Sequence, residues 1–124
     1  MAAILRPRWC TVVRPPGARL AVVGDTEEIT SLIEPVRRAD AMVIEATFLE
    51  RDTPLARSRG HLTAADAARL ACKADVGELL LTHISGRYQP QEILMEATRH
   101  FSNVRVVADF DRISIRARDR RGGS

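Results

Sequence analysis

One segment decides this fold, and it reads Ile44-Glu45-Ala46-Thr47-Phe48, then Gly60-His61-Leu62-Thr63-Ala64, then Leu81-Thr82-His83-Ile84-Ser85-Gly86-Arg87-Tyr88. In each piece a polar or ionisable side chain directly follows an apolar run or a glycine. A side chain just past the end of a strand is held by rigid backbone and stays open to a ligand. An earlier piece, Ala21-Val22-Val23-Gly24-Asp25-Thr26, has the same pattern. The sequence therefore offers four candidate site residues, which are Asp25, Glu45, His61 and His83.

The composition is that of an ordinary globular protein with one domain and a modest core. The chain has 124 residues, of which 45% are hydrophobic and 28% charged. A net charge of +3 permits an anionic partner without requiring one. One Trp, one Tyr and three Phe argue against a platform on which nucleic-acid bases stack.

The cysteines and the apolar runs indicate a cytoplasmic protein with no membrane partner. Cys10 and Cys72 lie far apart and in no CxxC pattern, so we expect two reduced, buried thiols. No apolar run approaches the roughly 20 residues of a membrane helix. The first residues also lack the apolar core of a signal peptide.

Hydrophobic spacing predicts strands that alternate with helices. The expected strands are 8–14, 19–23, 41–44, 78–82, 104–107 and 112–116, and the expected helices are 27–39, one that begins at His61 or Thr63, and 89–101. Pro35 predicts a break late in the first helix, and Asp66 three residues after Thr63 resembles a capping box. Residues 46–60 read as a long polar loop. The alternation predicts an α/β domain with a parallel-rich sheet and crossover helices.

Asp25 and His83 are of the types that bind zinc or manganese. A carboxylate can bridge two cations, and an imidazole can complete the coordination of one of them. Asp25 also suits a turn or a helix cap, and His83 suits a packed position after a strand. Residue spacing alone leaves both pairs of alternatives open.

The other candidates also have two interpretations each. His61 and Glu45 suit an acid–base pair or a structural hydrogen bond that anchors the long loop. Arg87 and Tyr88 suit a phosphate contact, or a solvated arginine beside a partly buried tyrosine. The basic cluster from Arg112 to Arg121 suits a solvated tail or a contact with nucleic acid.

Taken together, these pieces resemble the C-terminal half of ribonuclease Z, the tRNA 3′-processing endoribonuclease of the metallo-β-lactamase superfamily. The match covers about residues 20–111, and four pieces in this order are more specific than any one of them. The resemblance implies half of an αββα sandwich with a mixed sheet, over residues 1–116. A basic, disordered tail would follow at 117–124.

The resemblance also implies roles for the site residues. Asp25 would bridge two zinc ions and His83 would bind one of them. His61 would act at the scissile phosphate as a proton donor, with Glu45 orienting it. Ser85, Arg87 and Tyr88 are weaker candidates for phosphate contacts. The implied substrate is precursor tRNA or another RNA, cut at its 3′ end.

The sequence departs from the family in one respect. The family's first half carries a His-x-His-x-Asp-His zinc motif, whereas this chain has three histidines and no such motif. We therefore expect a fragment that is inactive alone and that pairs with an N-terminal half or with a second copy. The alternatives are a non-catalytic module that binds nucleic acid or protein, and another hydrolase of the same fold that acts on phosphodiesters or esters.

Overall fold

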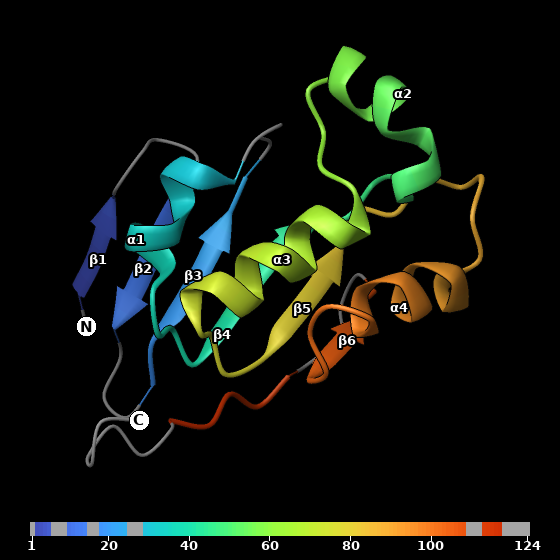
Figure 1. Ribbon diagram of the computed structural model, residues 1–124. Coiled ribbons are helices and arrows are strands. Elements are labelled where there is room, and N and C mark those ends of the chain that lie inside the picture. Colours follow the sequence, from blue (N-terminus) through green and yellow to red (C-terminus); the bar gives the residue numbers. More distant parts are fainter. Residues whose placement is uncertain (1, 6–9, 15–17, 25–28, 109–112, 118–124) are drawn as a thin grey trace.

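The computed structural model describes residues 2–5, 10–14, 18–24, 29–108 and 113–117, and within them one six-stranded sheet (Figure 1). The strands are β1 (Ala2–Leu5), β2 (Cys10–Arg14), β3 (Leu20–Val23), β4 (Ala41–Glu45), β5 (Leu79–Thr82) and β6 (Val104–Val106). They lie side by side in chain order. Strand β2 runs antiparallel to both of its neighbours, β1 and β3, and β3 to β6 are parallel. The predicted mixed sheet is confirmed.

Helices connect the parallel strands and cover one face of the sheet. They are η1 (Thr30–Leu32), α1 (Ile33–Val36), η2 (Glu50–Asp52), α2 (Thr53–Ser58), α3 (Ala64–Ala74) and α4 (Pro90–Thr98). In Figure 1, α1, α3 and α4 lie on the same side of the sheet. Because each parallel strand from β4 to β6 is added beside the previous one in the same direction, right-handed crossovers place α1, α3 and α4 on one face. Helix α2 lies beyond the edge to which β3, β4 and β5 point.

The core is formed where the alanine-rich helix α3 packs on the sheet. Its alanines at 64, 67, 68, 71 and 74 are buried together with Leu70. Ile44 and Leu81, from the neighbouring strands β4 and β5, belong to the same cluster. Small side chains let a helix approach the sheet closely, so α3 is held firmly against the strands that carry the candidate residues.

Both ends of α3 are capped. The Thr63 hydroxyl accepts a hydrogen bond from the Asp66 N–H (3.1 Å), and the Asp66 carboxylate accepts one from the Thr63 N–H (3.2 Å). The predicted capping box is therefore confirmed. Arg57 donates to the same carboxylate at 2.7 Å, which ties α2 to the start of α3. At the other end, Asp75 adopts a left-handed conformation that ends the helix.

Several predicted elements differ in the structure. The helix expected over 27–39 is only η1 and α1 in the described residues, because Pro35 has no N–H to donate within a helix. The expected loop at 46–60 contains η2 and α2, and Pro54 lies in the first turn of α2, where proline favours a helix start. The expected edge strand β2 is paired on both sides, because β1 lies outside it.

Two further expectations are wrong. Residues 113–116 form no strand, although half-buried Ile113 and Ile115 alternate with exposed Ser114 and Arg116. The alternation reflects only burial, since half-buried and exposed positions can alternate in a segment that is not part of a sheet. Cys72 is exposed rather than buried, because it lies on the outer side of α3. Within the described part of the chain, every helix is too short or too polar to cross a lipid bilayer.

The Thr63 cap should contribute measurably to stability, because its hydroxyl satisfies a buried N–H at the start of α3. We predict that Thr63→Ala lowers the free energy of unfolding by about 1–2 kcal/mol in urea. Thr98→Ala is the matched control, since the Thr98 hydroxyl is exposed and only bonds the Met95 carbonyl. Equal losses for the two variants would contradict the proposed importance of the cap.

Candidate functional site

The candidate residues meet at the edge of the sheet where the parallel strands end. Glu45 is the last residue of β4 and pairs in register with Thr82, the last residue of β5. The Ala46 N–H donates to the Thr82 carbonyl at 2.9 Å, so the two segments continue side by side past the ends of β4 and β5. His83 follows directly on β5. Parallel pairing thus places the Glu45 carboxylate next to the segment that carries His83.

Glu45 is a buried carboxylate with three protein partners. Its side chain is 5% exposed. Its Oε1 atom accepts a hydrogen bond from the Leu62 N–H at 3.0 Å and lies 3.3 Å from His61 Nδ1. Its Oε2 atom accepts a hydrogen bond from the Thr47 hydroxyl. A carboxylate that loses water needs such partners, and these three fix its orientation.

His61 is oriented by Glu45 and borders a second imidazole. With Nδ1 facing the carboxylate, Nε2 is the ring nitrogen that can serve a ligand. The ring centroids of His61 and His83 are 5.7 Å apart, with an edge-to-face angle of 73°. On another side, the Phe48 ring centroid lies 6.0 Å from that of His61. The predicted approach of Glu45 to His61 is confirmed.

His83 has an unusual backbone conformation. Its φ angle is +57°, in the left-handed region that residues other than glycine rarely adopt. Its side chain lies in an exposed position beside His61. Left-handed residues of this kind cluster at ligand-binding sites, where surrounding contacts hold them. The turn directs the imidazole toward the same edge as Glu45.

Among the described residues, one group has the donors to hold a metal ion. Glu45, His61 and His83 each offer one atom, and these atoms lie within 4.8 Å of one another. Imidazole nitrogens and carboxylate oxygens fit zinc in kind, although three donors are fewer than the usual four. The Glu45 oxygens already have three partners, which suits an orienting group better than a direct ligand.

The sequence paired His83 with Asp25 as metal ligands, and Asp25 lies outside the described residues. Strand β3 ends at Val23, and it runs parallel to β4. The strand that leads to Asp25 therefore points to the same edge as Glu45 and His83. The metal role of Asp25 stays a prediction.

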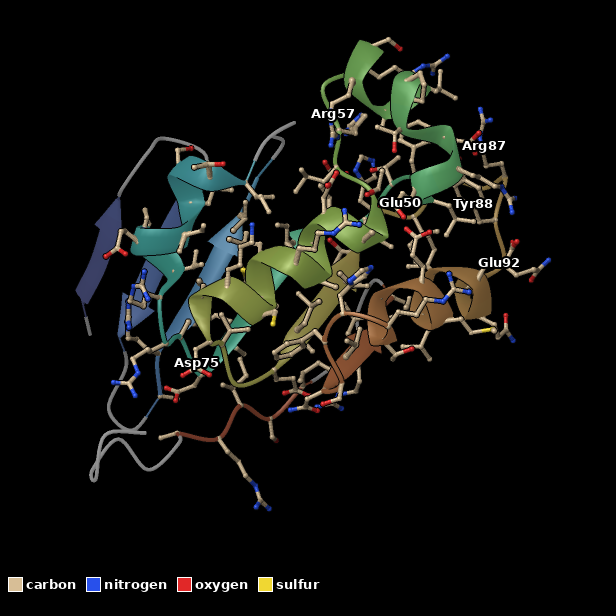
Figure 2. All side chains as sticks on the ribbon, viewed as in Figure 1. Glu50, Arg57, Asp75, Arg87, Tyr88 and Glu92 are labelled. Atoms are coloured by element: carbon tan, nitrogen blue, oxygen red, sulfur yellow. The ribbon has the colours of Figure 1, made fainter. Side chains whose placement is uncertain are left out.

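The three weaker candidates follow on the loop after β5. The Ser85 hydroxyl accepts a hydrogen bond from the Arg87 N–H at 3.3 Å. Arg87 is exposed, and its guanidinium carbon lies 5.7 Å from the Phe48 ring centroid. Tyr88 is 6% exposed, and its hydroxyl donates to Asp52. Figure 2 shows Arg87 and Tyr88 together at the α2 end of the molecule. Their phosphate role stays a prediction.

Sequence reasoning missed two residues that shape this site. Thr47 bonds the Glu45 carboxylate, and Phe48 contacts both His61 and Arg87. They are neighbours in the sequence and follow Glu45 after Ala46. Their position next to the strand end was the available signal, but their contacts depend on two distant loops.

Comparison with known proteins agrees with this arrangement. Residues 8–84 match the family model described as the beta-lactamase superfamily domain, which is more than half of the chain. The chain belongs to the beta-lactamase superfamily. The predicted metallo-β-lactamase type of fold is confirmed by a solved structure. The metallo-beta-lactamase fold protein YhfI from Bacillus subtilis superposes with a TM-score of 0.71 at 27% identity, over 80% of this chain and 40% of YhfI.

The resemblance to ribonuclease Z is also confirmed. The chain is 56% identical over 99 residues to ribonuclease Z of Bradyrhizobium diazoefficiens, which covers 80% of this chain and 33% of the relative. It is 47% identical over 95 residues to ribonuclease Z of Nocardia farcinica, over 76% of this chain and 31% of the relative. The short form of human tRNase Z superposes with a TM-score of 0.65 at 28% identity, over 86% of this chain and 37% of that protein. The chain thus spans about a third of the length of these curated relatives.

The contact between Glu45 and His61 should fix the tautomer of the ring. A carboxylate acceptor favours the form with its proton on Nδ1. We predict that ¹⁵N NMR at alkaline pH, where the imidazole is neutral, shows the Nδ1–H tautomer of His61. In Glu45→Gln the amide can donate as well as accept, so a mixture should appear. His100 is the internal control and should not change. An Nε2–H tautomer of His61 in the unaltered protein would contradict this assignment.

The burial of Tyr88 and its bond to Asp52 can also be tested, because Tyr88 is the chain's single tyrosine and its absorbance can be followed alone. Burial raises the pKa of Tyr88, and the hydrogen bond to Asp52 raises it further. The neutral phenol is thus favoured in the folded state, so this stabilisation is full below about pH 10 and is lost as pH rises through the raised value. Tyrosinate absorbance should titrate at higher pH in the folded chain than in urea. Asp52→Asn should lower the folded midpoint toward the ordinary value. Identical midpoints in the folded and unfolded chains would refute this expectation.

Proposed function

We propose that this chain contributes one part of the active site of a ribonuclease Z-like, zinc-dependent endoribonuclease that cuts precursor tRNA at its 3′ end. The observation that carries this proposal is the cluster of Glu45, His61 and His83 at the carboxyl edge of a parallel sheet. A chain that is 56% identical to a ribonuclease Z over most of its own length supports the same activity. The proposed location is the cytoplasm.

The proposed zinc ligands in this chain are His83 and Asp25. An imidazole and a carboxylate are both ligands of zinc, and His83 lies exposed at the edge toward which β3 leads. Bound zinc supplies Lewis acidity and an activated water for the hydrolysis of a phosphodiester. Two ligands are half of what one tetrahedral ion needs, and a pair of ions would need still more. The remaining ligands would come from a complementary chain segment.

His61 is proposed to carry the proton for the leaving oxygen of the scissile phosphodiester. Its Nδ1 atom lies 3.3 Å from the Glu45 carboxylate, which would stabilise the ring if both ring nitrogens carried protons. The Nε2 proton would then pass to the oxygen that leaves. Glu45 would orient the ring throughout, because its own bonds to Leu62 and Thr47 keep it in place.

Arg87, Ser85 and Tyr88 are proposed to lie along the phosphates of the RNA. The Arg87 guanidinium is exposed and pairs well with phosphate oxygens. The Ser85 hydroxyl is half-buried on the same loop. The Tyr88 hydroxyl is bonded to Asp52, so a phosphate contact from it would have to replace that bond.

A complementary N-terminal half, or a second copy of the chain, is the proposed partner. The sheet register aligns Val22 with Val43 and Val43 with Leu80 on the face turned away from α3. Leu80 is covered, whereas Val22 remains 40% exposed and Val43 is half-buried. An apolar row that is only partly covered supports a partner on this side.

The division of the ligands makes a clear prediction for the isolated chain. A half-built set of ligands binds zinc weakly, because affinity comes from a pre-arranged cage. We predict substoichiometric zinc by elemental analysis and negligible cleavage of precursor tRNA. Addition of a separately produced N-terminal half of a ribonuclease Z should restore both zinc and activity.

Variants of this chain supply the controls for that complementation. His83→Ala and Asp25→Ala should each abolish restored zinc binding, whereas His61→Ala should retain zinc and lose cleavage. His100→Ala should behave like the unaltered chain, since His100 lies at the end of α4, away from the edge. Two zinc ions per isolated chain, with turnover abolished by Asp25→Ala, would overturn the proposed division of ligands.

A further inference from the structure

The Phe48 ring contacts both His61 and Arg87 of the candidate site. Its ring centroid is 6.0 Å from that of His61, with an angle of 46° between the planes. The guanidinium carbon of Arg87 is 5.7 Å from the same centroid. The ring itself is buried, at 3% exposure, whereas Arg87 is exposed. One aromatic side chain thus contacts groups from two different loops.

The backbone around Phe48 is bonded on both sides. The Phe48 carbonyl accepts the Ala64 N–H at 2.8 Å, and Phe48 forms a parallel bridge with Thr63. On the other side, the Thr47 carbonyl accepts the Ser85 N–H at 3.1 Å. These bonds join the segment that follows β4 to the start of α3 and to the loop after β5. The backbone that carries the Phe48 ring is therefore hydrogen-bonded to the segments that follow His61 and precede Arg87.

An arginine on an exposed loop would otherwise occupy many rotamers. Immobilising such a long side chain for a ligand costs conformational entropy at the moment of binding. The electron-rich face of an aromatic ring attracts a guanidinium and holds it in advance. In the described residues Arg87 has no carboxylate partner, so its charge stays available to an anion.

We propose that Phe48 is a positioning residue: its ring holds the Arg87 guanidinium beside His61 and His83, so that a phosphate bound by Arg87 lies against both imidazoles. The inference rests on the proposed function only for the class of ligand, which is a phosphodiester oxyanion. It assigns to Phe48 a role in binding that differs from filling the core.

Titration with inorganic phosphate tests this role without metal or catalysis. We expect phosphate to shift the NMR signals of the Arg87 side chain and of the His61 and His83 rings. In Phe48→Leu, which keeps an apolar side chain, phosphate affinity should fall by about two- to fivefold. The Arg87 side-chain protons should also lose the ring-current shift that the aromatic face produces. Sodium chloride at equal ionic strength controls for screening.

Three further variants separate positioning from packing. Phe101→Leu makes the same change at a half-buried phenylalanine that packs on the core, and it should leave phosphate affinity unchanged. Pentafluorophenylalanine at position 48 keeps the ring shape but reverses its charge distribution, so it should weaken phosphate binding in a fully folded chain. In an Arg87→Gln background, Phe48→Leu should cause no additional loss.

The outcomes distinguish this inference from the proposed function. If Arg87→Gln weakens phosphate binding but both Phe48 variants leave it unchanged, the positioning role is wrong and Arg87 remains a phosphate contact. If Arg87→Gln has no effect, the inference fails together with the assignment of Arg87. Neither result bears on zinc binding and tRNA cleavage in the complementation experiment, which depend on His83, Asp25 and His61.

Discussion

The buried Glu45 carboxylate is the interaction on which the rest of the site depends. It ends the central strand β4, where 5% of its side chain remains exposed, so burial removes most of its hydration. The Thr47 hydroxyl, the Leu62 N–H and the His61 ring compensate for that loss. Thr47 is two residues away on the same segment, whereas His61 and Leu62 belong to a segment that must return to the end of β4. The need to satisfy one carboxylate thus brings together the parts of the site.

The alanine-rich helix α3 makes this arrangement rigid. It begins two residues after Leu62, with the capping box of Thr63 and Asp66 at its start. Its small buried face holds it close to β4 and β5, and the Leu62 N–H, just before the cap, donates to the Glu45 carboxylate. The Glu96 carboxylate on α4 adds a further anchor, since it accepts the Ala65 N–H at 3.0 Å. Packing of the core and orientation of the site are therefore coupled.

Several features could not be predicted from the sequence because the same local residue pattern fits two different structures. Pro54 reads as a loop residue, yet it lies in the first turn of α2. The alternation at Ile113–Arg116 resembles a strand, but it only distinguishes half-buried from exposed positions. Cys72 lies within an alanine-rich stripe, although its position on α3 faces outward. In each case the packing of neighbouring segments, rather than the local residue pattern, decides the secondary structure or the burial.

The sequence by itself determined the parallel strands, the capped helix α3 and the presence of Glu45 and His83 at strand ends. These features follow from hydrophobic periodicity and from groups within a few residues of each other. Only the tertiary structure decided that His61, sixteen residues from Glu45, faces its carboxylate, and that Phe48 contacts both His61 and Arg87. The left-handed turn at His83 belongs to this second group. Such contacts depend on how distant loops pack against one another, and no local pattern of residues encodes that packing.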